Sequence, residues 1–294
     1  MAFGKDSLYP IALFTLVKPA ELCATRYWNR YPGARVDTTV PHYEFSDPDL
    51  WADWHWTQRF PGSAELRAYF KYVADKWDLR KDSIFNTYVN SVVWHNDDSR
   101  WMIRTRDGRT FSARYFLPNT GFAAKRHIPD YKNLESFAGT WIHPSYWPKE
   151  EPDLKGKRIA VIGTGSTGVQ MIQELAPIAS EFTLFQRTPN LALPMGQVEY
   201  QGKEQGTSKD NYPSLYAGRK ESFGGFDFSF LPMKTFDVDT EERQKTYQAL
   251  WDHGDFHFWL ATYYDMLFSD EANTEAYNFW YSSRPCMIFT VLTF

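Results

Sequence analysis

Apolar residues recur at intervals of three and four positions between residues 63 and 77. This spacing places them on one face of a helix. Ser63 precedes the pattern and is a residue type that often caps a helix N-terminus. The pattern therefore predicts a helix that starts at Ser63 and buries one face. The residues of that face are Leu66, Tyr69, Phe70, Val73 and Trp77.

Short strand-like segments follow this helix as far as residue 117. Two of them flank Asp107-Gly108, a dipeptide typical of tight hairpin turns. We expect a β-meander that returns to a larger sheet. The segments are 84–89, 91–95, 101–105, 110–113 and 115–117.

Residues 144–157 carry three prolines and several charges, which indicates a domain boundary. Beyond it, residues 158–162 form an apolar strand, a helix extends to about Leu175, and residues 182–185 form a second strand. The order of strand, helix and strand is typical of an α/β domain with parallel strands.

The last hundred residues show weaker patterns. Residues 195–234 have little periodicity and much Gly, Ser and Pro, so we expect a long loop there. Thr240 is a suitable cap for a following helix, and helical character returns from Phe256 to Trp280.

Composition narrows the class of protein. The 294 residues suffice for about two domains. Lys and Arg number 32 against 36 Asp and Glu, so no basic surplus exists for nucleic acid, and we expect no such partner. Cys23 and Cys286 form no disulfide framework or metal cluster, and no apolar run approaches the roughly 18 residues that cross a bilayer. We expect a cytoplasmic protein that binds no metal. The apolar residues 11–17 could instead belong to a signal peptide, but Asp6 lies in the region that would have to be positive, and Pro10 interrupts the start of the apolar run.

The sharpest local motif is GTGSTG at residues 163–168. It follows a strand and opens a helix, which is the context that a dinucleotide-binding motif requires. Its first glycine permits the tight turn, the second admits a diphosphate close to the backbone, and the third lets helix and strand pack closely. The alternative is a glycine-rich turn without a ligand.

Arg187 follows the next strand, at the position where an NAD site has an acidic residue. A guanidinium binds a phosphate instead, which favours NADPH over NADH. The alternative is that Arg187 is an ordinary surface cation.

Two aromatic segments remain ambiguous from their residues alone. His143, in the connector before residue 158, either fixes a loop through hydrogen bonds, which we favour, or carries a proton. Residues 27–37 place aromatics, two arginines and Asp37 around Pro32-Gly33, which suits either a flat charged ligand or a surface turn with ion pairs.

Together these segments resemble the Baeyer–Villiger monooxygenases. Residues 137–148 fit every fixed position of the family fingerprint FxGxxxHxxxW(P/D). Residues 30–37, GTGSTG with the following FQRTP, and residues 115–129 resemble further family segments, with Asn119 replacing the usual small residue in the last. The fingerprint positions are Phe137, Gly139, His143, Trp147 and Pro148.

The resemblance implies an α/β flavoprotein with two Rossmann-like dinucleotide-binding domains, a β-meander and a helical extension. Residues 1–148 would form a partial FAD-binding domain with the meander and linker, and residues 149–294 an incomplete NADPH-binding domain with a helical insertion. NADPH would reduce FAD, the reduced flavin would activate O₂, and one oxygen atom would enter a small ketone to give an ester or lactone.

The resemblance also assigns residues. Asp37 would be catalytic at the junction of flavin and nicotinamide, where it would orient an arginine that stabilises developing negative charge. His143 and Trp147 would couple the linker to rotation of the NADPH domain. The FAD contacts would be Thr25, Trp28, Tyr43 and Val89, and the NADPH contacts Gly163, Thr164, Gly165, Ser166, Thr167, Gly168, Arg187 and Thr188.

Some residues depart from the family pattern. Residues 1–24 contain Gly4 as their only glycine, so the first dinucleotide motif of the family is missing, and Cys23-Ala24 replaces a glycine pair. The expectation is a chain shortened at both ends. Two alternatives stay open: an inactive NADPH-binding remnant, and a flavin monooxygenase that oxidises nitrogen or sulfur.

Overall fold

The computed structural model of the chain describes residues 15–16, 29–119, 126–188, 190–200, 208–283 and 291–292. Thr25 and Trp28, two of the expected FAD contacts, lie outside these residues. The chain separates into two compact units, which are described one at a time. The first consists of Met1–Arg30 and Leu66–Lys149, and the second of Tyr31–Glu65 and Glu150–Phe294.

The first unit contains the expected meander. Strands β3 (Val89–His95), β4 (Arg100–Thr105) and β5 (Thr110–Ala113) form an antiparallel sheet in the order β3-β4-β5. Trp94 pairs with Trp101 across β3 and β4, with their ring centroids 5.3 Å apart. Gly108 turns the β4–β5 hairpin with a φ of +88°. The hairpin prediction at Asp107-Gly108 is confirmed. The expectation that the meander returns to a larger sheet is wrong for the described residues, because β3, β4 and β5 pair only with one another.

Two strand predictions in this unit are wrong. Residues 84–89 are not one strand, because β2 (Ser83–Ile84) ends before Asn86, whose φ of +53° breaks the extended backbone. Strand β2 pairs in parallel with β1 (Thr15–Leu16). The segment at 115–117 forms no strand, and Tyr115 and Leu117 are 72% and 75% exposed. An apolar run of three residues does not distinguish a strand from an exposed connector.

Helix α3 (Ser63–Lys76) confirms the prediction from apolar periodicity. Trp77 differs from the expectation, because it lies just after the helix and is 40% exposed. Asp78 follows with a φ of +48° and turns the chain away. The residues that α3 buries are Leu66, Tyr69, Val73 and Ala74.

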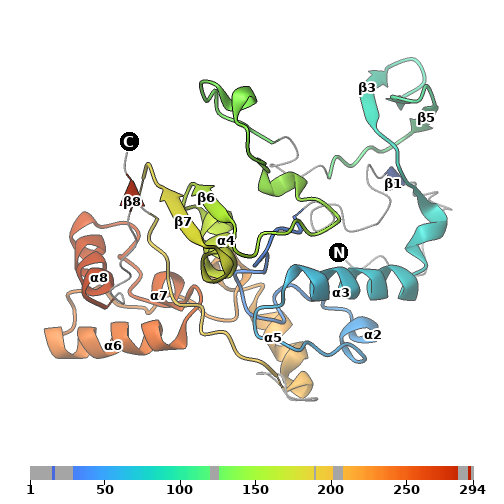
Figure 1. Cartoon of the computed structure of the whole chain (residues 1–294). Helices are drawn as coiled ribbons and strands as arrows, with labels where there is room; N and C mark the ends of the chain where they lie inside the picture. The colour runs from blue at the N-terminus through green and yellow to red at the C-terminus, as the bar shows by residue number, and fades with distance from the viewer. Residues whose placement is uncertain are drawn as a thin grey trace. The chain divides into compact units, whose positions relative to one another are not determined.

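The second unit contains a parallel sheet in the order β6-β7-β8, formed by β6 (Arg158–Ile162), β7 (Glu181–Phe185) and β8 (Val291–Leu292). Helix α4 (Ser166–Leu175) connects β6 to β7 and lies beside these strands in Figure 1. The strand–helix–strand prediction is therefore confirmed. Its buried apolar side chains are Val161, Met171, Leu175 and Leu184.

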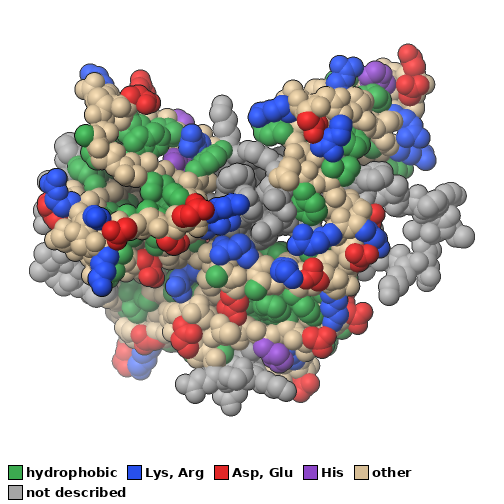
Figure 2. Space-filling model, turned by 45° about the vertical axis from the view of Figure 1, so that its right-hand side comes forward, with side chains coloured by type: hydrophobic (Ala, Val, Ile, Leu, Met, Phe, Trp, Pro, Cys, Tyr) green, Lys and Arg blue, Asp and Glu red, His purple; other side chains and the backbone are tan. Residues whose placement is uncertain are grey.

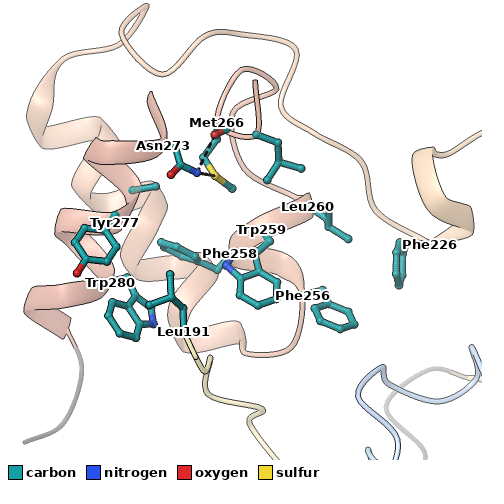
Figure 3. A pocket seen from close by; sticks show the side chains of 12 residues that line it. Leu191, Phe226, Phe256, Phe258, Trp259, Leu260, Met266, Asn273, Tyr277 and Trp280 are labelled. Carbon is teal, nitrogen blue, oxygen red and sulfur yellow. Dashed lines mark hydrogen bonds between the residues drawn. The ribbon is translucent and has the colours of Figure 1, made fainter. Parts of the chain in front are cut away.

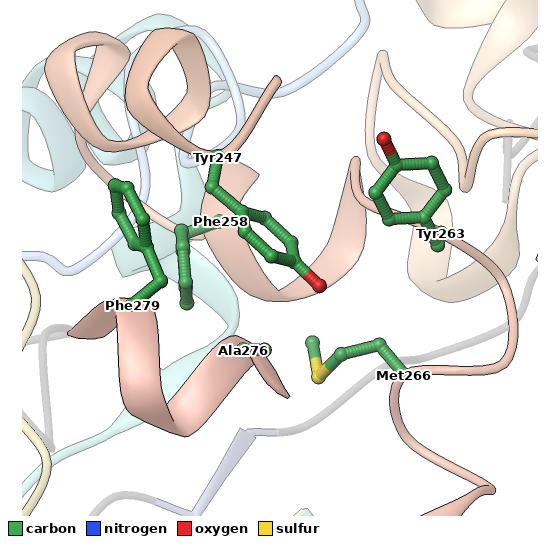
Figure 4. Close-up of a cluster of buried hydrophobic side chains, with 6 residues drawn as sticks. All are labelled: Tyr247, Phe258, Tyr263, Met266, Ala276 and Phe279. Carbon is green, nitrogen blue, oxygen red and sulfur yellow. The ribbon is translucent and has the colours of Figure 1, made fainter. Parts of the chain in front are cut away.

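The same unit contains helices α2 (Pro48–Trp51), α5 (Tyr212–Gly218), α6 (Thr240–His253), α7 (His257–Leu260) and α8 (Asp270–Ser283). An aromatic cluster joins α6, α7 and α8, with the rings of Tyr247, Phe258 and Phe279 within 5.7 Å of one another (Figure 4). Burial of these rings stabilises helices that have little amphipathic pattern of their own. The cluster consists of Tyr247, Phe258, Tyr263, Met266, Ala276 and Phe279.

Three helix predictions need correction. The cap of α6 is Asp239, whose carboxylate accepts a hydrogen bond from the Glu242 N–H at 2.9 Å, and Thr240 is the first helical residue. Residues 256–280 are interrupted between α7 and α8, because residues 261–269 turn back to bury Tyr263 and Met266. The expected loop at 195–234 contains α5. Short 3₁₀ helices occur at Leu79–Asp82, Leu134–Ser136, Pro144–Tyr146, Ala176–Ile178, Lys209–Asn211 and Phe223–Gly225.

The surface carries both signs of charge. Lys, Arg, Asp and Glu side chains are scattered over the face seen in Figure 2. Within the ranges that the structure describes, every helix is too short or too polar to cross a bilayer.

Arg59 connects three segments of the second unit. Its guanidinium donates hydrogen bonds to the carbonyl oxygens of Gly196 (3.1 Å) and His253 (2.9 Å) and to the Asp255 carboxylate (3.2 Å). The Asp255 side chain is only 3% exposed, and its other oxygen accepts a hydrogen bond from the His257 N–H at 2.8 Å and contacts the His257 imidazole.

We expect Arg59→Met to lower the free energy of unfolding by about 3 kcal/mol, because it leaves the Asp255 carboxylate buried without its guanidinium. Lys245→Met breaks an exposed ion pair with Glu241 in the same unit and should cost less than about 1 kcal/mol. Urea unfolding of both variants measures the difference. Equal losses would show that Arg59 contributes no more than a surface cation.

Candidate functional site

The glycine loop between β6 and α4 leaves an open surface at the start of the helix. Gly163 has a φ of +103°, and its N–H donates to the Phe185 carbonyl at 2.8 Å, which fixes the loop to the end of β7. A Cβ at Gly163 or Gly165 would meet no atom within 4 Å. A Cβ at Gly168 would overlap the Gly163 carbonyl oxygen, so α4 approaches the loop this closely only because residue 168 is glycine.

The first N–H groups of a helix have no partner within the helix, and the helix dipole adds partial positive charge there. The open side of the loop therefore offers backbone donors to an anion such as a diphosphate. The structure brings Gly163–Gly168 into the arrangement that the motif predicted.

The end of β7 lies beside this loop. Gln186 Nε2 donates to Thr164 Oγ1 at 3.0 Å, and Thr164 Oγ1 donates to the Thr188 carbonyl at 3.2 Å. Arg187, between Gln186 and Thr188 in the sequence, is exposed. Because β6 and β7 are parallel neighbours, Arg187 and the glycine loop share the carboxyl edge of the sheet.

The turn at residues 31–37 packs against the same helix. Tyr31 Oη donates to Gln170 Oε1 at 2.9 Å, and Gln170 Nε2 donates to the Arg35 carbonyl at 3.2 Å. Gly33 has a φ of +79°, and a Cβ there would overlap the Gln170 carbonyl oxygen. The turn that carries Asp37 is therefore held on α4, the helix that begins at the glycine loop.

Asp37 is exposed and follows Val36, which is 1% exposed. Its Oδ1 accepts a hydrogen bond from the Tyr43 hydroxyl at 2.9 Å. The structure thus brings together Asp37, which the family resemblance placed at the junction of flavin and nicotinamide, and Tyr43, which it placed along FAD.

Glu44, next to Tyr43, is a buried carboxyl group that the sequence did not single out. It is 5% exposed and accepts a hydrogen bond from Trp56 Nε1 at 3.1 Å. Burial raises its pKa to about 7, against smaller opposing effects of Trp56, the Lys209 ammonium and Tyr212. Glu44 therefore changes its charge near neutral pH.

The fingerprint residues lie in the first unit. His143 Nδ1 accepts a hydrogen bond from the Ser145 N–H at 3.2 Å and so caps the short helix Pro144–Tyr146. Trp147 is 6% exposed, whereas Phe137 is 59% exposed and stands over Gly139. Val89 begins β3 of the same unit. In the structure His143 thus makes a hydrogen bond that fixes the loop, as expected if its role is structural rather than proton transfer.

His253, Asp255 and His257 form a cluster that sequence reasoning missed, although the two histidines flank the aspartate at alternate positions. Their ligand atoms lie within 4.8 Å of one another, as in a metal site. The Arg59 guanidinium already contacts Asp255 Oδ2 and His253 Nδ1, each at 3.2 Å. Burial and the nearby charge of His257 lower the pKa of His253. His257 contacts the other oxygen of Asp255 through Nδ1, so the three residues are held by contacts among themselves and with Arg59.

A pocket of about 310 Å³ opens beside the aromatic cluster (Figure 3). Its lining is aromatic and aliphatic apart from Asn273, whose amide donates to the Met266 carbonyl at 3.3 Å. Such a lining suits an apolar group and supplies no acid or base near neutral pH. The lining residues are Leu191, Phe226, Phe256, Phe258, Trp259, Leu260, Met266, Leu267, Asn273, Ala276, Tyr277 and Trp280.

Residues 44–202 match the flavin-binding monooxygenase-like family. This match covers more than half of the chain, and the chain belongs to that family.

Similar curated proteins agree with the expected subclass. The cyclopentanone 1,2-monooxygenase of a Comamonas species is 41% identical over 261 residues, 89% of this chain and 48% of that protein. A Baeyer–Villiger monooxygenase of Pseudooceanicola batsensis is 34% identical over 262 residues, 88% of this chain and 48% of that protein. The chain spans about half the length of the curated relatives that it matches.

A solved structure agrees as well. Cyclohexanone monooxygenase from Rhodococcus sp. Phi1, bound to NADP⁺, superposes with a TM-score of 0.88 at 35% identity, over 92% of this chain and 51% of that one. The resemblance to Baeyer–Villiger monooxygenases and the Rossmann-like flavoprotein fold are thereby confirmed.

The two glycines of the loop should respond differently to a methyl group. We expect Gly168→Ala to lower the free energy of unfolding by about 2 kcal/mol, because the new Cβ meets the Gly163 backbone. At Gly165 the new Cβ would enter open space, and the φ of −68° suits alanine. Gly165→Ala should therefore change the free energy of unfolding by less than about 0.5 kcal/mol. Urea unfolding compares them, and an undisturbed Gly168→Ala would refute the close approach of α4 to the loop.

The raised pKa of Glu44 makes stability depend on pH. Between its ordinary value of 4.5 and about 7 the folded state binds more protons than the unfolded state. The free energy of unfolding should therefore fall as pH rises through this window, by about 3 kcal/mol in total. Urea unfolding at pH 5 and pH 7.5 should show this loss in the parent protein and not in Glu44→Gln. Glu241→Gln, at an exposed site, should retain it.

Proposed function

We propose that the protein is an NADPH- and FAD-dependent monooxygenase of the Baeyer–Villiger type. One oxygen atom of O₂ would be inserted beside the carbonyl carbon of a small ketone. The balance is ketone, O₂, NADPH and a proton to ester or lactone, NADP⁺ and water. The single observation that carries the proposal is the glycine loop at the start of α4, in a chain that belongs to the flavin-binding monooxygenase-like family.

The residues of the loop fit the diphosphate of NADP. The space that a Cβ would fill at Gly163 and Gly165 is open, so a phosphate can approach the backbone there. Ser166 and Thr167 begin the helix, and the Ser166 hydroxyl would add a donor; Thr164 and Thr188 lie alongside, hydrogen-bonded to each other. Arg187 would bind the 2′-phosphate that distinguishes NADPH from NADH.

The FAD site rests on the family and on fewer residues of this structure. FAD, when bound and reduced by NADPH, supplies the activation of O₂. Among the described residues we assign Asp37, Tyr43 and Val89 to it, and Thr25 and Trp28 outside them. The exposed Asp37 carboxylate, held by the Tyr43 hydroxyl, would orient an arginine beside the reacting groups.

The assignment of the FAD-binding and NADPH-binding domains to parts of the chain stays a prediction. Residues 1–148 would serve FAD and the linker, and residues 149–294 NADPH. His143 and Trp147 would transmit the position of the linker to the NADPH domain. A cytoplasmic location and the absence of a nucleic-acid partner also stay predictions.

The test is ketone-dependent oxidation of NADPH by the purified chain with added FAD, using cyclopentanone and identifying the product by mass spectrometry. A lactone one oxygen heavier than the ketone is expected. We expect Arg187→Ala to raise the KM for NADPH roughly tenfold, because a charge-assisted bond is lost, and to leave the KM for NADH unchanged.

Other outcomes would contradict the proposal in distinct ways. Oxidation of amines or thioethers without lactone formation would indicate a nitrogen- or sulfur-oxidising enzyme. Binding of NADP without any turnover would indicate an inactive chain. An equal effect of Arg187→Ala on both cofactors would remove its assignment to the 2′-phosphate.

A further inference from the structure

The partly exposed phenol of Tyr43 lies between two residues, His42 and Glu44, whose side chains are buried. The backbone turns there through hydrogen bonds from the His42 N–H to the Thr39 carbonyl and from the Glu44 N–H to the Pro41 carbonyl, both 3.0 Å long. Tyr43 reaches Asp37, whereas its two neighbours bond elsewhere in the second unit.

His42 is the first anchor, and its side chain is only 6% exposed. Nδ1 donates to the Thr39 carbonyl at 2.9 Å, and Nε2 lies 3.2 Å from Asp227 Oδ1. The Phe226 ring covers the imidazole, with centroids 5.4 Å apart, and Arg219 donates to the His42 carbonyl at 3.4 Å. Both ring nitrogens thus lie close to oxygen atoms, and the His42 imidazole lowers the pKa of Asp227.

Glu44 is the second anchor. Its carboxyl group bonds to Trp56, a residue with no exposed surface, and faces Tyr212 and Lys209. Lys209 is itself fixed, because its ammonium donates to the carbonyl oxygens of Ala52 (3.1 Å), Trp51 and Trp54. Two segments far along the chain, at 209–212 and at 227, therefore hold the residues on either side of Tyr43.

We propose that His42 and Glu44 are positioning residues that keep the Tyr43 hydroxyl on the Asp37 carboxylate. The proposal rests on the proposed function for the role of Asp37, but the positioning itself is a property of this chain alone.

The physical reason is competition with water. Asp37 is exposed, so a freely rotating phenol would gain little by replacing water at its carboxylate. A hydrogen bond forms with less loss of entropy when the backbone that carries its donor is already fixed. The two anchors fix that backbone one residue before and one residue after Tyr43.

The test is a double-mutant cycle on the full chain. The unfolding equilibrium constants of the parent, Tyr43→Phe, Asp37→Ala and the double variant give the coupling between the two side chains. We expect a coupling of roughly fivefold in the parent. It should fall to about one when the cycle is repeated in the Glu44→Leu or His42→Leu background.

A control in the same unit separates positioning from general stability. Glu275→Leu breaks an ion pair with Arg243 at a distance of 3.0 Å; the side chains are 24% and 8% exposed. We expect this background to be destabilised and to keep the fivefold coupling. The milder Glu44→Gln keeps an acceptor for Trp56 and should restore part of the coupling, which secures the test if Glu44→Leu does not fold.

An unchanged coupling in both anchor backgrounds, or no coupling in the parent, would overturn the proposal. The cycle uses no cofactor and no substrate, so a chain without ketone turnover would refute the proposed function and leave this result intact. In active enzyme, Glu44→Gln should lower kcat and leave the KM for NADPH unchanged. A rise in that KM alone would point to a structural effect on the NADPH site.

Discussion

The second unit depends on the close backbone contact between α4 and its two neighbours. On one side Gly168 meets the Gly163 carbonyl, and on the other Gly33 meets the Gln170 carbonyl. Any side chain at either glycine would push the helix away. These two contacts place an anion-binding helix start and the turn that carries Asp37 within one packed unit. The hydrogen bonds of Tyr31 and Gln170 then set the register of that turn on the helix.

Sequence patterns predicted those elements whose cause is local. The periodicity of α3, the strand β6 and the glycine loop were found because spacing and residue type alone determine them. Predictions failed where distant contacts decide: the 115–117 segment has no partner strand within the described residues, and the chain between α7 and α8 bends to bury Tyr263 and Met266. A sequence pattern contains no information about such contacts before the chain folds.

The site divides in the same way. Spacing singled out Gly163, Gly165 and Gly168, whose binding role stays a prediction, and the fingerprint at 137–148 pointed to the family that the comparisons confirmed. Glu44 and Arg59 were missed, because in the sequence each resembles an ordinary surface charge. Their partners, Lys209 for Glu44 and Asp255 for Arg59, lie more than 150 positions away along the chain. A buried charge cannot be recognised from sequence when its burial is produced by remote segments.

The fixed position of α4 also has a consequence for kinetics. Because backbone contacts on both sides already determine where the helix begins, a dinucleotide would meet donors that need no rearrangement, and the cost of ordering them is met during folding. Encounter would then be limited by diffusion and orientation, and differences in affinity among related nucleotides would lie chiefly in how long each stays bound.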